Sequence, residues 1–265
     1  MPELPEVEAV CRKLRKEAVG GVIAEVEVLR LRSVHPQSPD ALEQAVGRSI
    51  RAVERRGKNI LLHLSGGYTL RVHLRMTGNL FVIPDARFHS VRVRVNFRFR
   101  DGRGLVFEDF RALGSVTIHE QVELDKLLKK IGIEPLSTEF TVARLLEMAK
   151  KSNKPAKIFL MDQQHIAGIG NMYAAEALFR ARVNPKRPIR GVRKDKMQVL
   201  HEALLSVLRE AMKDAVRSYS KPGSYGEMEF LVYGRKGEPC KVCRRKIARI
   251  VQGGRSTYYC PRCQR

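Results

Sequence analysis

The chain has 265 residues and a formal net charge of +22, from 50 Lys and Arg against 28 Asp and Glu. This length allows two domains, and the charge favours a phosphate polymer or another anionic surface as partner. No apolar run approaches the ~20 residues of a membrane-spanning helix, and the charged residues that crowd the first 17 positions argue against a secretory signal peptide. We therefore expect a cytoplasmic protein that does not enter a membrane.

An amphipathic helix is predicted over residues 5–18. It begins inside the opening stretch MPELPE, at Pro5. Its apolar face follows helical spacing and consists of Val7, Val10, Cys11, Leu14 and Ala18. Cys11 is interpreted as a small buried apolar residue. Pro5 suits the first turn of a helix because its fixed φ and missing N–H cost nothing there. Pro2 and Glu3 have no comparable structural task, so the pattern leaves their role open.

The segment after this helix alternates with the period of two that is typical of β-strands. In SVRVRVNFRF, apolar residues at odd positions from Val91 to Phe99 alternate with arginines at 92, 94, 98 and 100. The sequence DGRG at 101–104 then predicts a hairpin turn into LVFEDF. One face of this hairpin should pack inward while the other carries the arginines.

From about Glu120 the pattern becomes helical and includes one long helix, KDKMQVLHEALLSVLREAMKDAVR. Helices that follow a block of strands favour an α+β chain or two domains. We predict a β-rich domain over residues 1–120, a linker over 121–134, a helical domain over 135–222 and a compact basic segment over 231–265.

The basic C-terminal segment contains a strong metal-binding pattern, C-x2-C-x16-C-x2-C. Its members are Cys240, Cys243, Cys260 and Cys263. Two such pairs can hold one tetrahedral zinc ion with no open coordination position, so the pattern predicts a structural zinc; a pair of redox disulfides is the alternative. Residues 235–265 carry ten Lys and Arg against one acid, Glu238, which favours contact with nucleic-acid phosphates. Arg255, in the turn GGRST, could enter a groove or clamp a phosphate, or be merely solvated.

A weaker signal lies in DQQHIAGIGNMYAAEALF, where Gly168 and Gly170 precede Asn171 and a predicted helix. Glycines at such a place let backbone N–H groups approach an anion at the helix N-terminus. A glycine turn between two helices is also common without a ligand. Lys157, shortly before this segment, could add a further phosphate contact.

Together these motifs resemble formamidopyrimidine-DNA glycosylase, in the family shared with endonuclease VIII. The resemblance rests on MPELPE, RRGKNILLHL, HLRMTGNL, the AGIGN segment, VYGRKGEPC and GGRSTYYCPRCQ, which occur in this order along the whole chain. It implies an α+β fold with an N-terminal catalytic β-sandwich domain behind a leading helix, a helix–two-turn–helix DNA-binding domain and a zinc finger. It also implies a monomer that acts on damaged double-stranded DNA in base excision repair.

The resemblance gives the opening stretch a chemical meaning. After removal of Met1, the secondary amine of Pro2 would attack C1′ of the damaged nucleotide and form a Schiff base, and β,δ-elimination would follow. An α-amine has a pKa of about 8 against about 10.4 for lysine, so far more of it is unprotonated at neutral pH. Glu3 would act as general acid and base with support from Glu6, and Lys58 would hold the phosphate beside the lesion and assist strand cleavage.

The resemblance also implies a set of DNA contacts. The phosphates that flank the flipped nucleotide would be bound by His73, Lys157, Asn171 and Arg255. The void that flipping leaves in the duplex would be filled by Met76, Arg111 and Leu113. A carboxylate facing the flipped nucleotide would be that of Glu176.

Two departures from the family pattern bear on substrate choice. The third void-filling residue is usually Phe in RRFG, whereas residues 111–114 read RALG here, so Leu113 would wedge with less stacking on its neighbours. The loop that closes over 8-oxoguanine is also short, since only SYSKPGSYGEME lies between Arg217 and Phe230. We therefore expect weaker selection for 8-oxoguanine than for formamidopyrimidines, hydantoins, oxidised pyrimidines and abasic sites.

Two other classes of protein share part of this pattern. A non-catalytic zinc-finger DNA-binding protein would need the basic charge and the zinc site, but it would not need Pro2, Glu3 and Lys58. An RNA-binding or ribosome-associated zinc-ribbon protein would leave MPELPE unexplained. A covalent adduct with abasic DNA would distinguish the enzyme from both.

Overall fold

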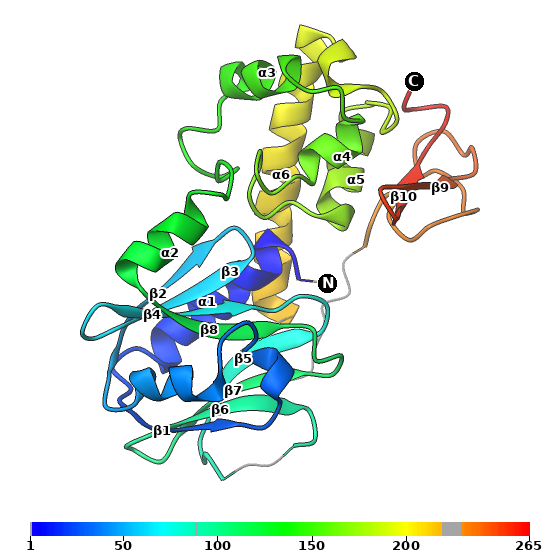
Figure 1. Ribbon diagram of the computed structural model, residues 1–265. Helices are drawn as coiled ribbons and strands as arrows, with labels where there is room; N and C mark the ends of the chain where they lie inside the picture. The colour runs from blue at the N-terminus through cyan, green and yellow to red at the C-terminus, as the bar shows by residue number, and fades with distance from the viewer. Residues whose placement is uncertain (1, 88–89, 219–228) are drawn as a thin grey trace. The chain divides into compact units, whose positions relative to one another are not determined.

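The computed structural model describes residues 2–87, 90–218 and 229–265 (Figure 1). They form two compact units: the first contains the chain up to Lys130 together with the residues from Ala215 to the end of the long helix, and the second contains the rest. The predicted α+β class is confirmed, with a leading helix and strands followed by helices and a small C-terminal hairpin. Among the described helices, none combines the length and the apolar character needed to cross a bilayer.

The first unit is a sandwich of two four-stranded antiparallel sheets, with strand orders β2-β3-β4-β8 and β1-β6-β7-β5. Its elements are α1 (Leu4–Glu17), β1 (Ile23–Val28), η1 (Leu31–Ser33), η2 (Pro39–Ala45), β2 (Ile50–Arg56), β3 (Asn59–Leu64), β4 (Tyr68–His73), β5 (Gly78–Ile83), β6 (Val93–Phe99), β7 (Gly104–Asp109), β8 (Ser115–Glu120) and α2 (Gln121–Leu128). β6 and β7 form the predicted hairpin, in which Phe97 lies opposite Leu105.

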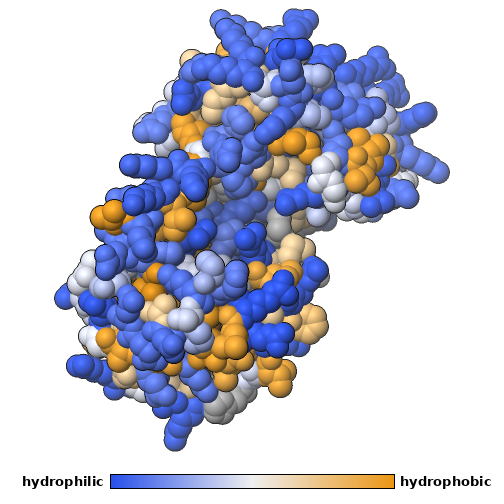
Figure 2. Space-filling model, in the orientation of Figure 1, coloured by the Kyte–Doolittle hydropathy of each residue, from blue (hydrophilic) through white to orange (hydrophobic). Residues whose placement is uncertain are grey.

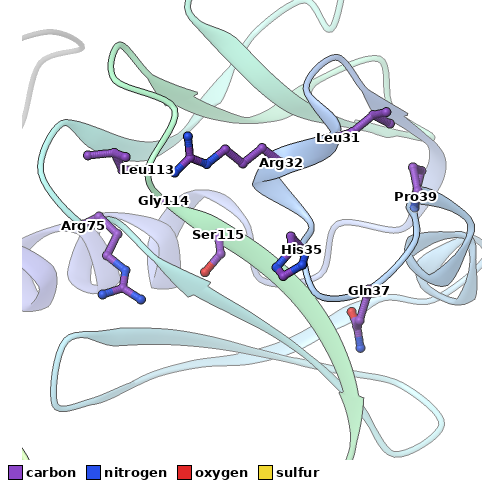
Figure 3. A pocket seen from close by; sticks show the side chains of 9 residues that line it. All are labelled: Leu31, Arg32, His35, Gln37, Pro39, Arg75, Leu113, Gly114 and Ser115. Carbon is purple, nitrogen blue, oxygen red and sulfur yellow. The ribbon is translucent and has the colours of Figure 1, made fainter.

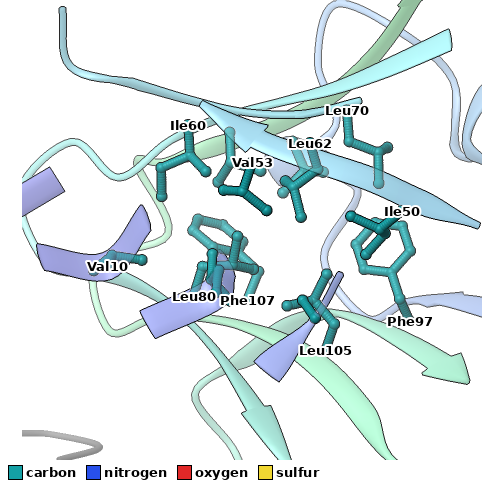
Figure 4. Close-up of a cluster of buried hydrophobic side chains, with 14 of the residues drawn as sticks. Val10, Ile50, Val53, Ile60, Leu62, Leu70, Leu80, Phe97, Leu105 and Phe107 are labelled. Carbon is teal, nitrogen blue, oxygen red and sulfur yellow. The ribbon is translucent and has the colours of Figure 1, made fainter. Parts of the chain in front are cut away.

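The core of the first unit lies between the two sheets, as the alternation of strand side chains requires. Figure 4 shows Ile60, Leu62 and Leu70 of one sheet facing Leu105 and Phe107 of the other, all of them buried. The apolar face of α1 joins this core, and Cys11 is completely buried there as predicted. Burial raises the pKa of the Cys11 thiol to about 12, so this cysteine stays protonated and unreactive.

The second unit packs its helices around a separate core that includes Phe159, Tyr173 and Leu204. Its elements are α3 (Val142–Lys150), α4 (Ala156–Leu160), α5 (Asn171–Arg180), η3 (Ile189–Gly191), α6 (Lys194–Ser218), β9 (Ala248–Gln252) and β10 (Arg255–Tyr259). Only the part of α6 up to Asp214 belongs to this unit. A small cluster that contains Phe179, Val232 and Cys260 attaches the C-terminal hairpin region to α5. On the face shown in Figure 2, hydrophilic residues cover most of each unit, which agrees with a chain that is 29% charged.

Candidate functional site

The candidate nucleophile and its carboxylates lie together at the start of α1. Pro2, Glu3 and Glu6 are all buried, and Glu3 is completely so. Glu3 is the N-cap of the helix, and its backbone N–H donates to Glu6 Oε2 at 2.7 Å within a capping box. Pro5 occupies the first turn, as the sequence predicted. Glu6 therefore fixes the backbone that carries Glu3 and, next to it, Pro2.

Lys58 lies in the two-residue turn between β2 and β3, directly after Gly57. Gly57 has φ +58°, a left-handed conformation that favours glycine in tight hairpin turns. The guanidinium of Arg55 donates to Glu8 Oε2 at 3.2 Å and to the Gly57 carbonyl at 3.0 Å. Because Glu8 lies on α1, this arginine ties the leading helix to the turn that carries Lys58.

His73 ends β4 and lies across the ladder from Asn59, the residue after Lys58. Its Nδ1 accepts a hydrogen bond of 3.1 Å from the backbone N–H of Arg75. Burial, and then the charges of Arg75, Arg71 and Lys58, lower its pKa to about 3. The imidazole is therefore neutral near pH 7, and with Nδ1 as acceptor its proton lies on Nε2, which can donate to an anion.

We expect acid to weaken the first unit through His73. Unfolded, the imidazole has a pKa of about 6.5, whereas in the folded chain its pKa is about 3. The unfolded state binds the proton more readily, so the stability gained from neutral His73 is present above about pH 6.5 and is lost as the pH falls towards 3. Urea unfolding at a series of pH values should show that the free energy of unfolding falls more steeply between pH 6.5 and 4 in the wild type than in His73→Gln. An equal dependence of this free energy on pH in the two proteins would contradict the prediction. His35→Gln changes an exposed histidine and should keep the pH dependence of the wild type.

The candidate void-filling residues lie on two loops of the first unit. Met76, in the turn between β4 and β5, is 38% exposed. Arg111 and Leu113 lie between β7 and β8, the first exposed and the second half-buried. The structure therefore places all three where they reach solvent, and their contact with DNA stays a prediction.

Asp109, which the sequence analysis did not single out, organises both of these loops. It is completely buried, and its Oδ2 accepts from the backbone N–H groups of Leu113 and Gly114, each at 2.7 Å. Its Oδ1 accepts from the Arg111 N–H at 3.2 Å and from the Thr77 hydroxyl. An acid at a strand end before a glycine-containing turn is the signal that could have found it, because Asp commonly accepts from the backbone of the turn that follows.

Asp109→Ala should destabilise the first unit and disorder the Arg111–Gly114 loop. A carboxylate that accepts backbone hydrogen bonds in a buried place contributes about 1.5–3 kcal/mol per bond, and its loss leaves buried N–H groups unsatisfied. We expect a fall of about 3 kcal/mol in the free energy of unfolding, measured by urea titration. Glu108→Ala, at the half-buried neighbouring position, is the matched control, and its free energy of unfolding should fall clearly less. An equal fall in the two variants would refute the role of Asp109.

In the second unit, Lys157 and Arg255 are brought next to each other. Lys157 is completely buried on α4, and its Nζ donates to the Ser256 carbonyl at 3.0 Å and to Thr257 Oγ1 at 2.8 Å. Arg255 is exposed and follows the tight turn Gly253–Gly254 between β9 and β10. Lys157 therefore anchors the hairpin that presents Arg255, and its own contact with a phosphate stays a prediction.

Asn171 is the first residue of α5, directly after Gly170 as N-cap. The loop before it is held by the side chain of Gln163, which donates to the Ile169 carbonyl at 2.7 Å and accepts from the Gly168 N–H at 2.9 Å. Gly168 has φ +81°, so this turn requires a residue that tolerates the left-handed region. The predicted glycine turn at a helix N-terminus is thus present in the structure.

Glu176 is almost completely buried on α5. Its carboxylate accepts from the backbone N–H groups of Leu231, Val232 and Tyr233 at 2.8–2.9 Å. These bonds attach the chain that enters the C-terminal hairpin region to α5. The contact of Glu176 with a flipped nucleotide stays a prediction beside this structural role.

The four cysteines form a site that fits one zinc ion. The Sγ atoms of Cys240 and Cys263 are 3.9 Å apart, those of Cys243 and Cys260 are 3.4 Å apart, and all four lie within 4.8 Å of one another. Tetrahedral Zn–S bonds of about 2.3 Å place sulfur atoms about 3.8 Å apart, whereas a disulfide would need about 2.05 Å. The geometry supports the predicted structural zinc, and the alternative of two disulfides is not formed.

Three family models match consecutive parts of the chain. Residues 1–116 match the formamidopyrimidine-DNA glycosylase N-terminal domain, residues 131–221 its H2TH domain, and residues 237–265 the zinc finger found in FPG and IleRS. Similar curated proteins include the formamidopyrimidine-DNA glycosylases of Chloroflexus aggregans (40% identical, over all of this chain and 98% of the relative) and Halalkalibacterium halodurans (37%, over all of both).

Solved structures give the same result for the fold. Lactococcus lactis Fpg with N7-benzyl-Fapy-dG DNA is 33% identical over the whole of both chains, with a TM-score of 0.91. The same protein with abasic-site DNA is 32% identical over 99% of both chains, with a TM-score of 0.90.

The segment 219–228, on which the expectation about 8-oxoguanine depends, lies outside the described residues.

Proposed function

Because the chain belongs to the formamidopyrimidine-DNA glycosylase family, we propose that it is a bifunctional DNA glycosylase and AP lyase of base excision repair. It excises oxidised bases through a Schiff base on the Pro2 nitrogen and then cleaves the strand by β,δ-elimination. The observation that carries this proposal is the start of α1, where Pro2 adjoins the completely buried Glu3 and Glu6 holds the Glu3 backbone.

The proposed reaction uses the groups of the first unit in order. The free amine of Pro2 attacks C1′ as the bond from C1′ to the damaged base breaks, and the proton released from the proline nitrogen leaves with the base; Glu3 then protonates O4′ as the C1′–O4′ bond opens. The resulting cationic Schiff base acidifies C2′, whose proton is lost as the 3′ phosphate leaves; in the second elimination the C4′ proton is lost as the 5′ phosphate leaves. Lys58 and the neutral His73, whose Nε2–H can donate, hold the phosphate beside the lesion.

The second unit binds the DNA backbone in this proposal. Arg255 at the hairpin tip, Asn171 at the N-terminus of α5 and Lys157 behind the hairpin contact phosphates around the flipped nucleotide, which Glu176 faces. The zinc ion, held by the four cysteines, keeps the hairpin folded and takes no part in the chemistry. Met76, Arg111 and Leu113 fill the void in the duplex.

The substrate is damaged double-stranded DNA, and the protein acts as a monomer in the cytoplasm. Similar proteins were solved with DNA that contains Fapy-dG, an abasic site or carbocyclic 8-oxo-G, which supports this class of substrate. The domain limits that we propose are 1–120 for the catalytic domain, 135–222 for the helix–two-turn–helix domain and 231–265 for the zinc finger, with a linker over 121–134.

A lesion panel in duplex DNA tests this function. We expect cleavage that leaves phosphate at both ends of the gap, with formamidopyrimidine, hydantoin, oxidised-pyrimidine and abasic substrates cut faster than 8-oxoguanine opposite cytosine. Excision of 8-oxoguanine as fast as any other lesion would disprove the proposed preference. Binding to these duplexes with no cleavage of any would instead favour the alternative, a non-catalytic zinc-finger DNA-binding protein.

A further inference from the structure

An open cavity of about 670 Å³ lies in the first unit beside the loop that carries Leu113 (Figure 3). Its walls come from the η1 segment, the β4–β5 turn and the start of β8, and they include Arg32, His35, Arg75 and Ser115. Figure 3 shows the Arg32 side chain reaching from η1 towards Leu113 and Gly114. A cavity of this size can enclose a nucleotide-sized group.

The polar lining of this cavity suits an anion. Two guanidinium groups, an imidazole and a hydroxyl line it, and no carboxylate does. The side chains of Arg32, His35, Arg75 and Ser115 make no hydrogen bond or salt bridge within the described part of the chain. The amide of Gln37 is the exception, because it pairs with the backbone of Ile118 at 2.6 and 2.9 Å. The cationic groups are thus available to a ligand.

The strand order places the cavity on the β8 side of the candidate lesion-strand phosphate site, with Leu113 in its lining. Lys58 lies in the β2–β3 turn and His73 at the end of β4, while Ser115, opposite His73, begins the edge strand β8. The cavity lies beyond β8, where Gln37 covers part of the strand edge. Neighbouring strands are about 4.8 Å apart, so the edge of the cavity at Ser115 lies about one strand spacing from His73 and about 10 Å from the Lys58 turn. Leu113, which lines the cavity, lies in the loop that leads into the edge strand.

A side chain that fills the void of a flipped nucleotide has one DNA backbone on each side. With the lesion strand on the side of Lys58 and His73, the other side of the void-filling Leu113 faces the opposite strand. We infer that this cavity binds a phosphodiester of the strand opposite the lesion, with Arg32 and Arg75 on the phosphate and the adjoining sugar against Leu31. This inference rests on the proposed function, because that function assigns Leu113 to the void in the duplex and Lys58 and His73 to the lesion strand.

The experiment compares Arg32→Ala with the wild type on a duplex that contains a tetrahydrofuran abasic analogue. Loss of one phosphate contact should weaken binding about tenfold at low salt and reduce the slope of log K against log salt by about 0.9. A single methylphosphonate, scanned along the opposite strand, should reproduce the loss in the wild type at one position and cause no further loss in Arg32→Ala. Arg51→Ala, an exposed arginine on β2 that does not line the cavity, is the matched control and should keep the wild-type slope.

Single-stranded abasic DNA separates this inference from the proposed function. It has no opposite strand, so Arg32→Ala should form the borohydride-trapped adduct on it as fast as the wild type. An unchanged salt slope, or a methylphosphonate effect that couples to Arg32 only on the lesion strand, would overturn the inference. Absence of an adduct with the wild type on either DNA would overturn the proposed function instead.

Discussion

Glu3→Gln is expected to lower base excision by about 10²- to 10⁴-fold, the usual contribution of a positioned general acid or base. Glutamine keeps the size of the side chain and can still accept a hydrogen bond, but it cannot deliver a proton to O4′. The backbone N–H of residue 3 would still donate to Glu6 Oε2, so the start of α1 should remain folded. Single-turnover excision from a formamidopyrimidine duplex, measured beside urea unfolding, tests both statements.

Glu17→Gln is the matched control for this variant. Glu17 lies at the other end of the same helix and pairs with Lys13 at 4.0 Å, so its change tests the effect of losing a carboxylate from α1 without touching the Pro2–Glu3 pair. We expect excision to stay within about threefold of the wild type, since an interaction of about 0.5 kcal/mol changes a rate by little more than twofold. A Glu3→Gln enzyme that is as active as Glu17→Gln would remove Glu3 from the mechanism.

Cys260→Ser is expected to cost the largest share of DNA affinity. Cys240 and Cys260 are completely buried in the cluster that holds the C-terminal hairpin region against α5. Binding of a structural zinc contributes about 10–16 kcal/mol to the folding of such small modules, so its loss should unfold the hairpin that presents Arg255. We expect no bound zinc and a loss of at least about 100-fold in affinity for abasic-analogue duplex, because the proposed contact of Arg255 is lost and that of Lys157, which bonds to the hairpin, is misplaced.

Cys11→Ala provides the control, because this cysteine lies in the core of the first unit and outside the zinc site. It should retain one zinc per chain by atomic absorption and bind DNA like the wild type. Full DNA affinity in a zinc-free Cys260→Ser protein would show that the hairpin does not depend on the metal.

Local sequence patterns predicted the features whose causes are local. Pro5 lies in the first turn of α1 because its φ suits that place, each C-x2-C pair presents two thiolates to one metal ion, and the turn at 101–104 joins two alternating strands. The helix start and the hairpin turn are contacts between sequence neighbours, and each C-x2-C pair is local as well, although the two pairs meet across 17 to 23 positions.

The contacts that position the candidate site could not be predicted from local sequence patterns. Lys157 donates to residues about 100 positions away, and Glu176 accepts from N–H groups 55 to 57 positions away. Nothing in the periodicity around either residue distinguishes a charged group that is buried and bonded from one that faces a ligand. The cavity beside Leu113 likewise joins η1 to β8, which are far apart in the chain.

The central claim is that the nucleophile is the amine of Pro2, and borohydride trapping with peptide mapping tests it most directly. Intact mass first establishes that Met1 has been removed, because an amide nitrogen cannot attack C1′. Incubation with abasic duplex and borohydride should then yield a covalent adduct that maps to Pro2, and Pro2→Gly should form it more slowly. An adduct that maps to a lysine such as Lys58, or one formed undiminished by Pro2→Gly, would contradict the account.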